Sequence, residues 1–167
     1  MSVQSIMAIG PVIPVVIIEN IDDAIPLADA LIEGGIGTIE ITLRSAVALK
    51  AIALISQERP DLTIGAGTVL TPLQMRAVQE AGADFVVSPG AYPDLLKSAR
   101  DGGAVFLPGA TTASEMMLLM ANGLTAMKFF PATVAGGPEY LKALASPLAD
   151  LVSVSYTHLT LPTTTIV

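Results

Sequence analysis

The chain lacks cysteine and tryptophan, and only one of its 167 residues is a histidine. Without cysteine there can be no disulfide framework, no thiolate nucleophile and no zinc site built on sulfur. The one histidine, His158, cannot form a metal cluster by itself. These absences exclude thiol chemistry, and we expect no metal site.

Charge is also scarce. Only 14% of the residues are charged, eight of them are Lys or Arg, and the net charge is −7. Few and scattered cations argue against a nucleic-acid partner, since binding to phosphate backbones depends on clustered positive charge. Apolar residues make up 52% of the chain. This bias is typical of parallel sheets that are covered by helices on both faces.

One apolar stretch, residues 6–18, could be mistaken for a targeting segment. It contains Pro11 and Pro14, has no basic region before it and is too short to span a bilayer. We therefore expect no membrane partner and a cytoplasmic location.

Short β-branched runs alternate with longer helical segments, and glycine or proline marks the joins. The strands are expected over residues 12–18, 38–43, 63–69, 85–88, 105–108 and around Lys128, and the helices over 21–33, 45–58, 71–82, 93–100, 112–123 and 138–145, after a short N-terminal helix. This order predicts an α/β fold of about six βα units in one domain. A barrel is favoured over an open doubly wound sheet, because no glycine-rich turn follows the first strand.

Lys128 lies within the apolar run Ala-Met-Lys-Phe-Phe-Pro, residues 126–131, which otherwise resembles a buried strand. Burial disfavours the protonated form of an amine, which is how a lysine becomes a nucleophile near neutral pH. The structural alternative is a lysine whose stem packs on apolar surface while its ammonium group reaches water.

A second group of polar residues lies in the run Thr-Ile-Glu-Ile-Thr-Leu-Arg, residues 38–44. Strand alternation places Thr38, Glu40, Thr42 and Arg44 on one face, opposite the apolar residues. Glu40 and Lys128 could then act as an acid/base and an amine nucleophile, with Arg44 holding a substrate carboxylate at the carboxyl end of its strand. The alternative is a structural ion pair between Glu40 and Arg44.

A third, weaker signal is the sequence Gly-Ala-Gly-Thr-Val at residues 65–69. Its glycines leave space beside the backbone, and the Thr68 hydroxyl could donate to a bound anion. Glycine-rich strand ends more often reflect tight packing. The methionines Met116, Met117 and Met120 have helical spacing and are predicted to be core residues.

Five motifs together resemble the KDPG/KHG aldolase family: GPVIPVV, IEITLR, GAGTVL, VSPG and KFFPA, in this order. The resemblance extends over about residues 5–152. It implies a class I aldolase on a (β/α)8 TIM barrel, forming a homotrimer and using neither metal nor cofactor. The implied reaction cleaves a 2-keto acid to pyruvate and an aldehyde, which is glyceraldehyde 3-phosphate or glyoxylate.

By motif, the resemblance assigns the Schiff-base lysine to Lys128 and the general acid/base to Glu40. It assigns contacts with the pyruvate carboxylate to Arg44 and Thr68. Two alternatives stay open. One is a catalytically impaired barrel fragment that keeps the pyruvate pocket, and the other is a sugar-phosphate isomerase or epimerase in which Glu40 is the base and Lys128 acts only through its charge.

The C-terminal sequence departs from the family pattern. The family continues into a CPTGG-like and then a GGSW-like turn, whereas residues 154–167 resemble a translated sequencing adapter. We therefore expect an aldolase domain over residues 1–153, with six βα units and the start of a seventh strand, followed by a non-native tail. The alternative is a genuine divergent C-terminus.

Overall fold

Strands and helices alternate along the chain in the computed structural model, which describes residues 2–155. The strands are β1 (Val15–Val16), β2 (Thr38–Thr42), β3 (Thr63–Gly67), β4 (Phe85–Val87), β5 (Phe106–Leu107), β6 (Gly109–Ala110), β7 (Ala126–Phe129) and β8 (Val152–Ser155). The helices are α1 (Val3–Met7), the 3-10 turn η1 (Ile21–Asp23), α2 (Ala24–Glu33), α3 (Ala48–Glu58), α4 (Pro72–Glu80), α5 (Pro93–Asp101), α6 (Ala113–Ala121) and α7 (Gly137–Ala145).

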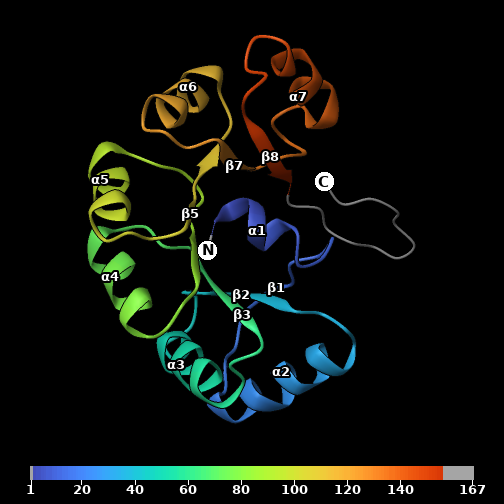
Figure 1. Ribbon diagram of the computed structural model, residues 1–167, viewed down its shortest axis with the longest axis vertical. Helices are drawn as coiled ribbons and strands as arrows, with labels where there is room; N and C mark the ends of the chain where they lie inside the picture. The colour runs from blue at the N-terminus through green and yellow to red at the C-terminus, as the bar shows by residue number, and fades with distance from the viewer. Residues whose placement is uncertain (1, 156–167) are drawn as a thin grey trace.

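All strand pairs are parallel, and the strands form two ladders in the orders β1-β2-β3-β4-β5 and β6-β7-β8. Only Pro108 separates β5 from β6, so these two strands are successive parts of one segment that changes partners. The helices α2 to α7 follow one another around the outside of the curved strand wall (Figure 1). The predicted α/β fold, an incomplete (β/α) barrel, is confirmed.

Side-chain caps begin two of the outer helices, α4 and α6. The Thr71 hydroxyl accepts from the Gln74 amide ahead of Pro72, and Thr112 forms a capping box with Glu115. These side chains satisfy amide groups that the first turn of a helix leaves unpaired. The helices predicted at these positions are therefore present.

The first strand is much shorter than predicted, with β1 limited to two residues. Pro14 has no N–H, so it can only accept, and its carbonyl receives the Glu40 amide at 2.8 Å. The methionine prediction was also only partly right. Met116 is buried in the core and Met120 is half-buried, but Met117 is exposed.

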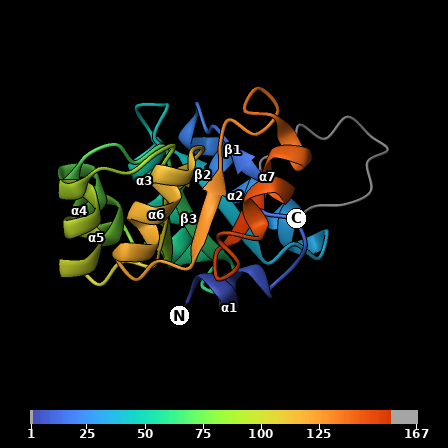
Figure 2. The same ribbon diagram turned by 90° about the horizontal axis from the view of Figure 1, so that it is seen from above.

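The protein has two apolar cores. The larger lies between strands and helices and includes Ile39 and Ile41 of β2. The smaller fills the barrel interior and consists of Ile6, Phe85, Val87, Leu107 and Ala126. Helix α1 appears in the centre of the ring in Figure 1 and beyond the amino-terminal ends of the strands in Figure 2. It therefore closes that end of the barrel with Ile6.

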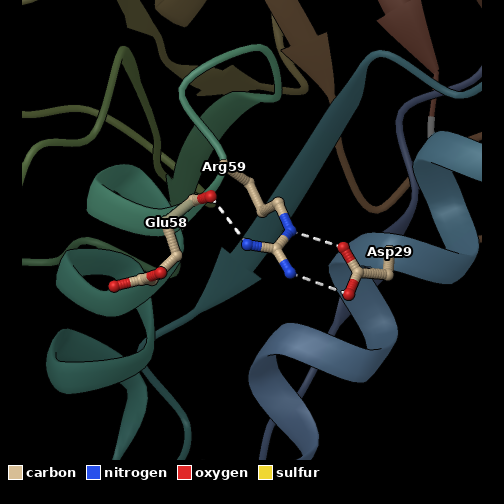
Figure 3. A network of polar contacts seen from close by, with 3 residues as sticks. All are labelled: Asp29, Glu58 and Arg59. Carbon is tan, nitrogen blue, oxygen red and sulfur yellow. Dashed lines mark hydrogen bonds and ion pairs between the residues drawn. The ribbon is translucent and has the colours of Figure 1, made fainter.

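An ion pair joins two neighbouring outer helices (Figure 3). Arg59, which follows α3, contacts Asp29 of α2 through Nε and also through Nη2, which lies 2.9 Å from Oδ2. Its third nitrogen, Nη1, donates to the Glu58 carbonyl at 2.7 Å. The hydrogen bond from Arg59 holds the pKa of Asp29 below its ordinary value, so the pair stabilises the fold at neutral pH and this contribution is lost as pH falls through the lowered pKa.

The predicted domain boundary at residue 153 falls inside β8, whose residues pair with β7. Residues 156–167, including His158, lie outside the described part of the chain, and the non-native tail stays a prediction. No helix within residues 2–155 is long and apolar enough to cross a membrane.

The closure of the barrel by α1 can be tested with Ile6→Ala. Ile6 is 2% exposed, and truncating a buried isoleucine to alanine costs about 2–5 kcal/mol of unfolding free energy. Ile9, just after the same helix, is 41% exposed and serves as the matched control. Urea unfolding should show a clear loss of unfolding free energy for Ile6→Ala and a smaller loss for Ile9→Ala. Equal losses would contradict the closure of the barrel by α1.

Candidate active site

An amine and a carboxyl group meet inside the barrel. Lys128 Nζ on β7 lies 3.5 Å from Glu40 Oε1 on β2, although the two residues are 88 positions apart in the chain. The Lys128 side chain is 13% exposed and that of Glu40 only 6%. The structure thus brings together the two residues that the sequence analysis singled out.

Alternation along β2 directs Glu40 inward. All five residues of this strand are buried, with Ile39 and Ile41 packed in the larger core between strands and helices. The opposite face carries Thr38, Glu40 and Thr42, as the sequence predicts. The Thr38 and Thr42 hydroxyls donate to the carbonyls of Val12 and Val16 at 3.4 and 3.0 Å. These two hydroxyls therefore join β2 to the first strand segment.

Gly67, the last residue of β3, makes room for the Glu40 carboxylate. A Cβ at this position would overlap the Glu40 side chain, at its Oε1, Cδ and Cγ atoms. Glu40 pairs in register with Gly65, so its side chain leans towards the carboxyl end of the sheet. Gly65 has a packing role instead, because a Cβ there would overlap the Phe85 ring.

Burial dominates the electrostatics of Glu40. Desolvation raises the pKa of the Glu40 carboxyl, and the opposing effects of the Lys128 and Arg44 charges do not outweigh it. Glu40 consequently holds a proton more tightly than an ordinary glutamate. A carboxyl group with a raised pKa is a better proton donor at a given pH than an ordinary glutamate carboxylate and, once ionised, a stronger base.

Lys128 also has an aromatic neighbour two residues along its strand direction. Its Nζ lies 5.5 Å from the centroid of the Phe130 ring, a distance at which a cation and a ring face attract each other. The backbone carbonyl of Phe130 accepts a hydrogen bond from Thr111 Oγ1 at 2.6 Å. Phe130 thus covers part of the amine and is itself tied to the loop after β6.

Arg44 lies two residues beyond the end of β2 and is exposed. Its Nε donates to Thr42 Oγ1 at 3.2 Å, and its charge acts on Glu40 without an ion pair within 4 Å. The alternative of a structural Glu40–Arg44 ion pair is therefore replaced by one between Glu40 and Lys128.

Thr68 follows Gly67 directly, at the carboxyl end of β3. Its φ is +59°, and within residues 2–155 it is the one non-glycine residue with a positive φ. A β-branched residue rarely adopts this conformation, and such strain often marks a functional site. Because parallel strands end at one edge, Thr68 and Arg44 belong to the same end of the barrel as the carboxylate that leans over Gly67.

Sequence reasoning missed two contributions to this site. It did not assign Gly67 as the space for Glu40, and it did not find the bond between Thr42 and Arg44. The alternating pattern of residues 38–44 places Thr42 on the correct face, but a side-chain bond to a flexible arginine leaves no pattern of its own. Among the described residues, no group of three or more acidic or histidine side chains could hold a metal ion.

The arrangement supports covalent chemistry on a carbonyl compound. A shielded amine is a nucleophile that can form an iminium, and a neighbouring carboxyl group can move the protons that this requires. A guanidinium group at the open end suits a carboxylate on the same molecule.

Comparison with known proteins agrees with this chemistry. Residues 3–159 match the family model described as KDPG and KHG aldolase, so the match extends past residue 153. The KHG/KDPG aldolase of Escherichia coli strain K12 is 45% identical over 150 residues, which are 90% of this chain and 70% of that protein.

Solved structures of related enzymes share the fold. The 2-keto-3-deoxy-6-phospho-gluconate aldolase of Zymomonas mobilis matches with a TM-score of 0.91 and 42% identity, covering 96% of this chain and 77% of that one. The KDPG aldolase of Legionella pneumophila, with pyruvate captured at low pH as a covalent carbinolamine intermediate, has a TM-score of 0.90 and 41% identity, covering 93% and 75%.

The role of Gly67 can be tested with Gly67→Ala. The added methyl group displaces the Glu40 carboxylate from Lys128, and a displacement of about 1 Å in a catalytic group can cost about a hundredfold in rate. Gly10→Ala is the control, because a Cβ at residue 10 has open space around it. Aldol cleavage should fall strongly in the first variant only, with both variants folded by circular dichroism. Full activity of Gly67→Ala would contradict the assignment.

Proposed function

This chain belongs to the KDPG and KHG aldolase family, and we propose that it cleaves 2-dehydro-3-deoxy-6-phosphogluconate to pyruvate and glyceraldehyde 3-phosphate through a Schiff base on Lys128. The observation that carries this proposal is the 3.5 Å contact between Lys128 Nζ and Glu40 Oε1 in a shielded interior. A small 2-keto acid is accordingly the substrate.

In the first stage the unprotonated Lys128 amine attacks the C2 carbonyl carbon of the substrate. Loss of the former carbonyl oxygen as water gives an iminium, which draws electrons from the neighbouring carbons. The carbinolamine captured in the Legionella pneumophila enzyme is the species that precedes this loss of water. Glu40, whose pKa is raised by burial, supplies the proton that the leaving water needs.

In the second stage Glu40, now a carboxylate, takes the proton from the C4 hydroxyl. The C3–C4 bond breaks, its electron pair enters the iminium to form an enamine, and the C4 fragment leaves as the aldehyde. Protonation of the enamine at C3 and hydrolysis of the iminium release pyruvate and the free amine. One buried carboxyl group thus serves in turn as acid and base, as its raised pKa favours.

Arg44 and Thr68 are proposed to hold the substrate carboxylate. A guanidinium group offers paired N–H donors to the two oxygens of a carboxylate, and the threonine hydroxyl offers one more donor. Their position after β2 and β3, at the carboxyl end of the strands, supports this role.

The proposed activity also includes the cleavage of 4-hydroxy-2-oxoglutarate to pyruvate and glyoxylate, because the two substrates share the part that becomes pyruvate. The homotrimer of the family and a cytoplasmic location are further parts of the proposal.

The Schiff base can be tested by trapping. The protein is incubated with pyruvate, reduced with borohydride and analysed by mass spectrometry, which should locate one covalent adduct on Lys128. The adduct should disappear in Lys128→Ala and persist in Lys142→Ala, whose amine is exposed and paired with Glu139. A folded wild-type protein without an adduct would remove the aldolase mechanism and favour an isomerase in which Lys128 acts only through its charge.

The role of Glu40 can be tested by the pH dependence of kcat/KM. Since burial raises its pKa, the base form should be lost as pH falls through a value above about 4.3, the ordinary pKa of glutamate. Glu40→Gln should remove this limb and lower the cleavage rate about a hundredfold or more. Glu139→Gln, an exposed glutamate on α7, should keep the wild-type profile. An acidic limb that survives in Glu40→Gln would assign it to another group.

A further inference from the structure

Thr42 connects the substrate end of the barrel to its rigid wall. It is the last residue of β2, it is 1% exposed, and its hydroxyl makes two hydrogen bonds. The hydroxyl donates to the Val16 carbonyl on β1 at 3.0 Å, and its oxygen accepts from Arg44 Nε at 3.2 Å. Thr42 therefore lies between a fixed strand and a charged side chain at the surface.

The first of these bonds determines the direction of the second. A hydroxyl has a single proton, so once this proton is donated to Val16 the oxygen can only accept. Thr42 is buried and β-branched, so its χ1 angle is restricted. Its Oγ1 therefore keeps a lone pair directed at Arg44. The strand pairing of Val16 with Ile41 fixes the position of the carbonyl itself.

The bond between Arg44 Nε and Thr42 also determines which N–H groups of the guanidinium can bind a substrate carboxylate. Arginine has five N–H groups arranged in a planar fork. Because the Arg44 Nε–H is used by Thr42, Arg44 cannot bind a carboxylate through Nε and Nη2 as Arg59 binds Asp29. The two terminal amino groups then remain to bind the two carboxylate oxygens. An exposed arginine loses rotamer entropy when it binds a ligand, and a side chain already held in place loses less.

We propose that Thr42 is the positioning residue for carboxylate recognition by Arg44. This inference rests on the proposed function, since it assumes that Arg44 holds the carboxylate of a 2-keto acid. Thr42 does not touch the substrate. It orients the guanidinium, so its loss weakens substrate binding and leaves the chemistry at Lys128 intact.

The chain contains a matched control for this role. Thr38, at the other end of the same strand and on the same face, is equally buried, and its hydroxyl donates to the Val12 carbonyl at 3.4 Å. Thr38 makes the same kind of bond between the strand segments, but it has no bond to Arg44. Thr38→Val and Thr42→Val thus remove similar structural bonds, and only the second releases the arginine.

The experiment measures borohydride trapping on the whole chain as a function of pyruvate concentration. Thr42→Val, which keeps the shape and removes the hydroxyl, should raise the half-saturating pyruvate concentration about three- to tenfold, the effect of one hydrogen bond. The maximal trapping rate should change less than twofold. Thr42→Ser, which restores the hydroxyl, should return the half-saturating concentration to near wild type, and Thr38→Val should leave it unchanged.

Other outcomes would overturn the proposal. An unchanged half-saturating concentration in Thr42→Val, or an equal rise in Thr38→Val, would show that Thr42 is only structural. In an Arg44→Gln background, Thr42→Val should add no further rise, and an additive effect would contradict action through Arg44. Thermal melting checks each variant, and Thr42→Ala replaces Thr42→Val if that variant does not fold. A wild-type protein that forms no adduct at any pyruvate concentration overturns the proposed function itself, whereas normal adduct formation with no shift overturns the role of Thr42 alone.

Discussion

The contact between Glu40 and Lys128 explains much of the architecture around it. Removing a carboxylate and an ammonium from water is costly, and a buried ion pair is tolerated only where the partners meet with good geometry. The geometry here depends on a strand that turns alternate residues inward, a glycine that makes room for the carboxylate, and an aromatic ring beside the amine. Even so, burial outweighs the attraction of the cations on Glu40, whose pKa remains raised.

The smaller apolar core, at the amino-terminal end of the barrel, also helps to bury the Glu40–Lys128 pair. Ile6 and Phe85 fill the interior at the amino-terminal ends of the strands, and Phe85 occupies the space above Gly65. This apolar cluster therefore separates the pair from water at the amino-terminal end of the barrel. The two glycines of β3 have different roles. Gly65 leaves space for the Phe85 ring, and Gly67 leaves space for the Glu40 carboxyl group.

Much of this could be predicted from sequence because strand alternation is a local rule. It places Glu40 inside from its immediate neighbours, and charges within apolar runs identify both members of the pair. What the pattern left open was the partner of Glu40, since Arg44 is four residues away and Lys128 is 88. That choice depends on how the wall curves, which no single strand encodes. The short first strand was missed for a different reason, because Pro14 fits an extended run but cannot donate to a ladder.

Pro108 has a mechanical consequence for the site. The segment that contains it pairs with β4 before the proline and with β7 after it, and the Pro108 carbonyl accepts the Lys128 amide at 2.8 Å. Glu40 therefore belongs to one hydrogen-bonded ladder and Lys128 to the other. The 3.5 Å contact between Lys128 Nζ and Glu40 Oε1 therefore links two ladders that meet at Pro108.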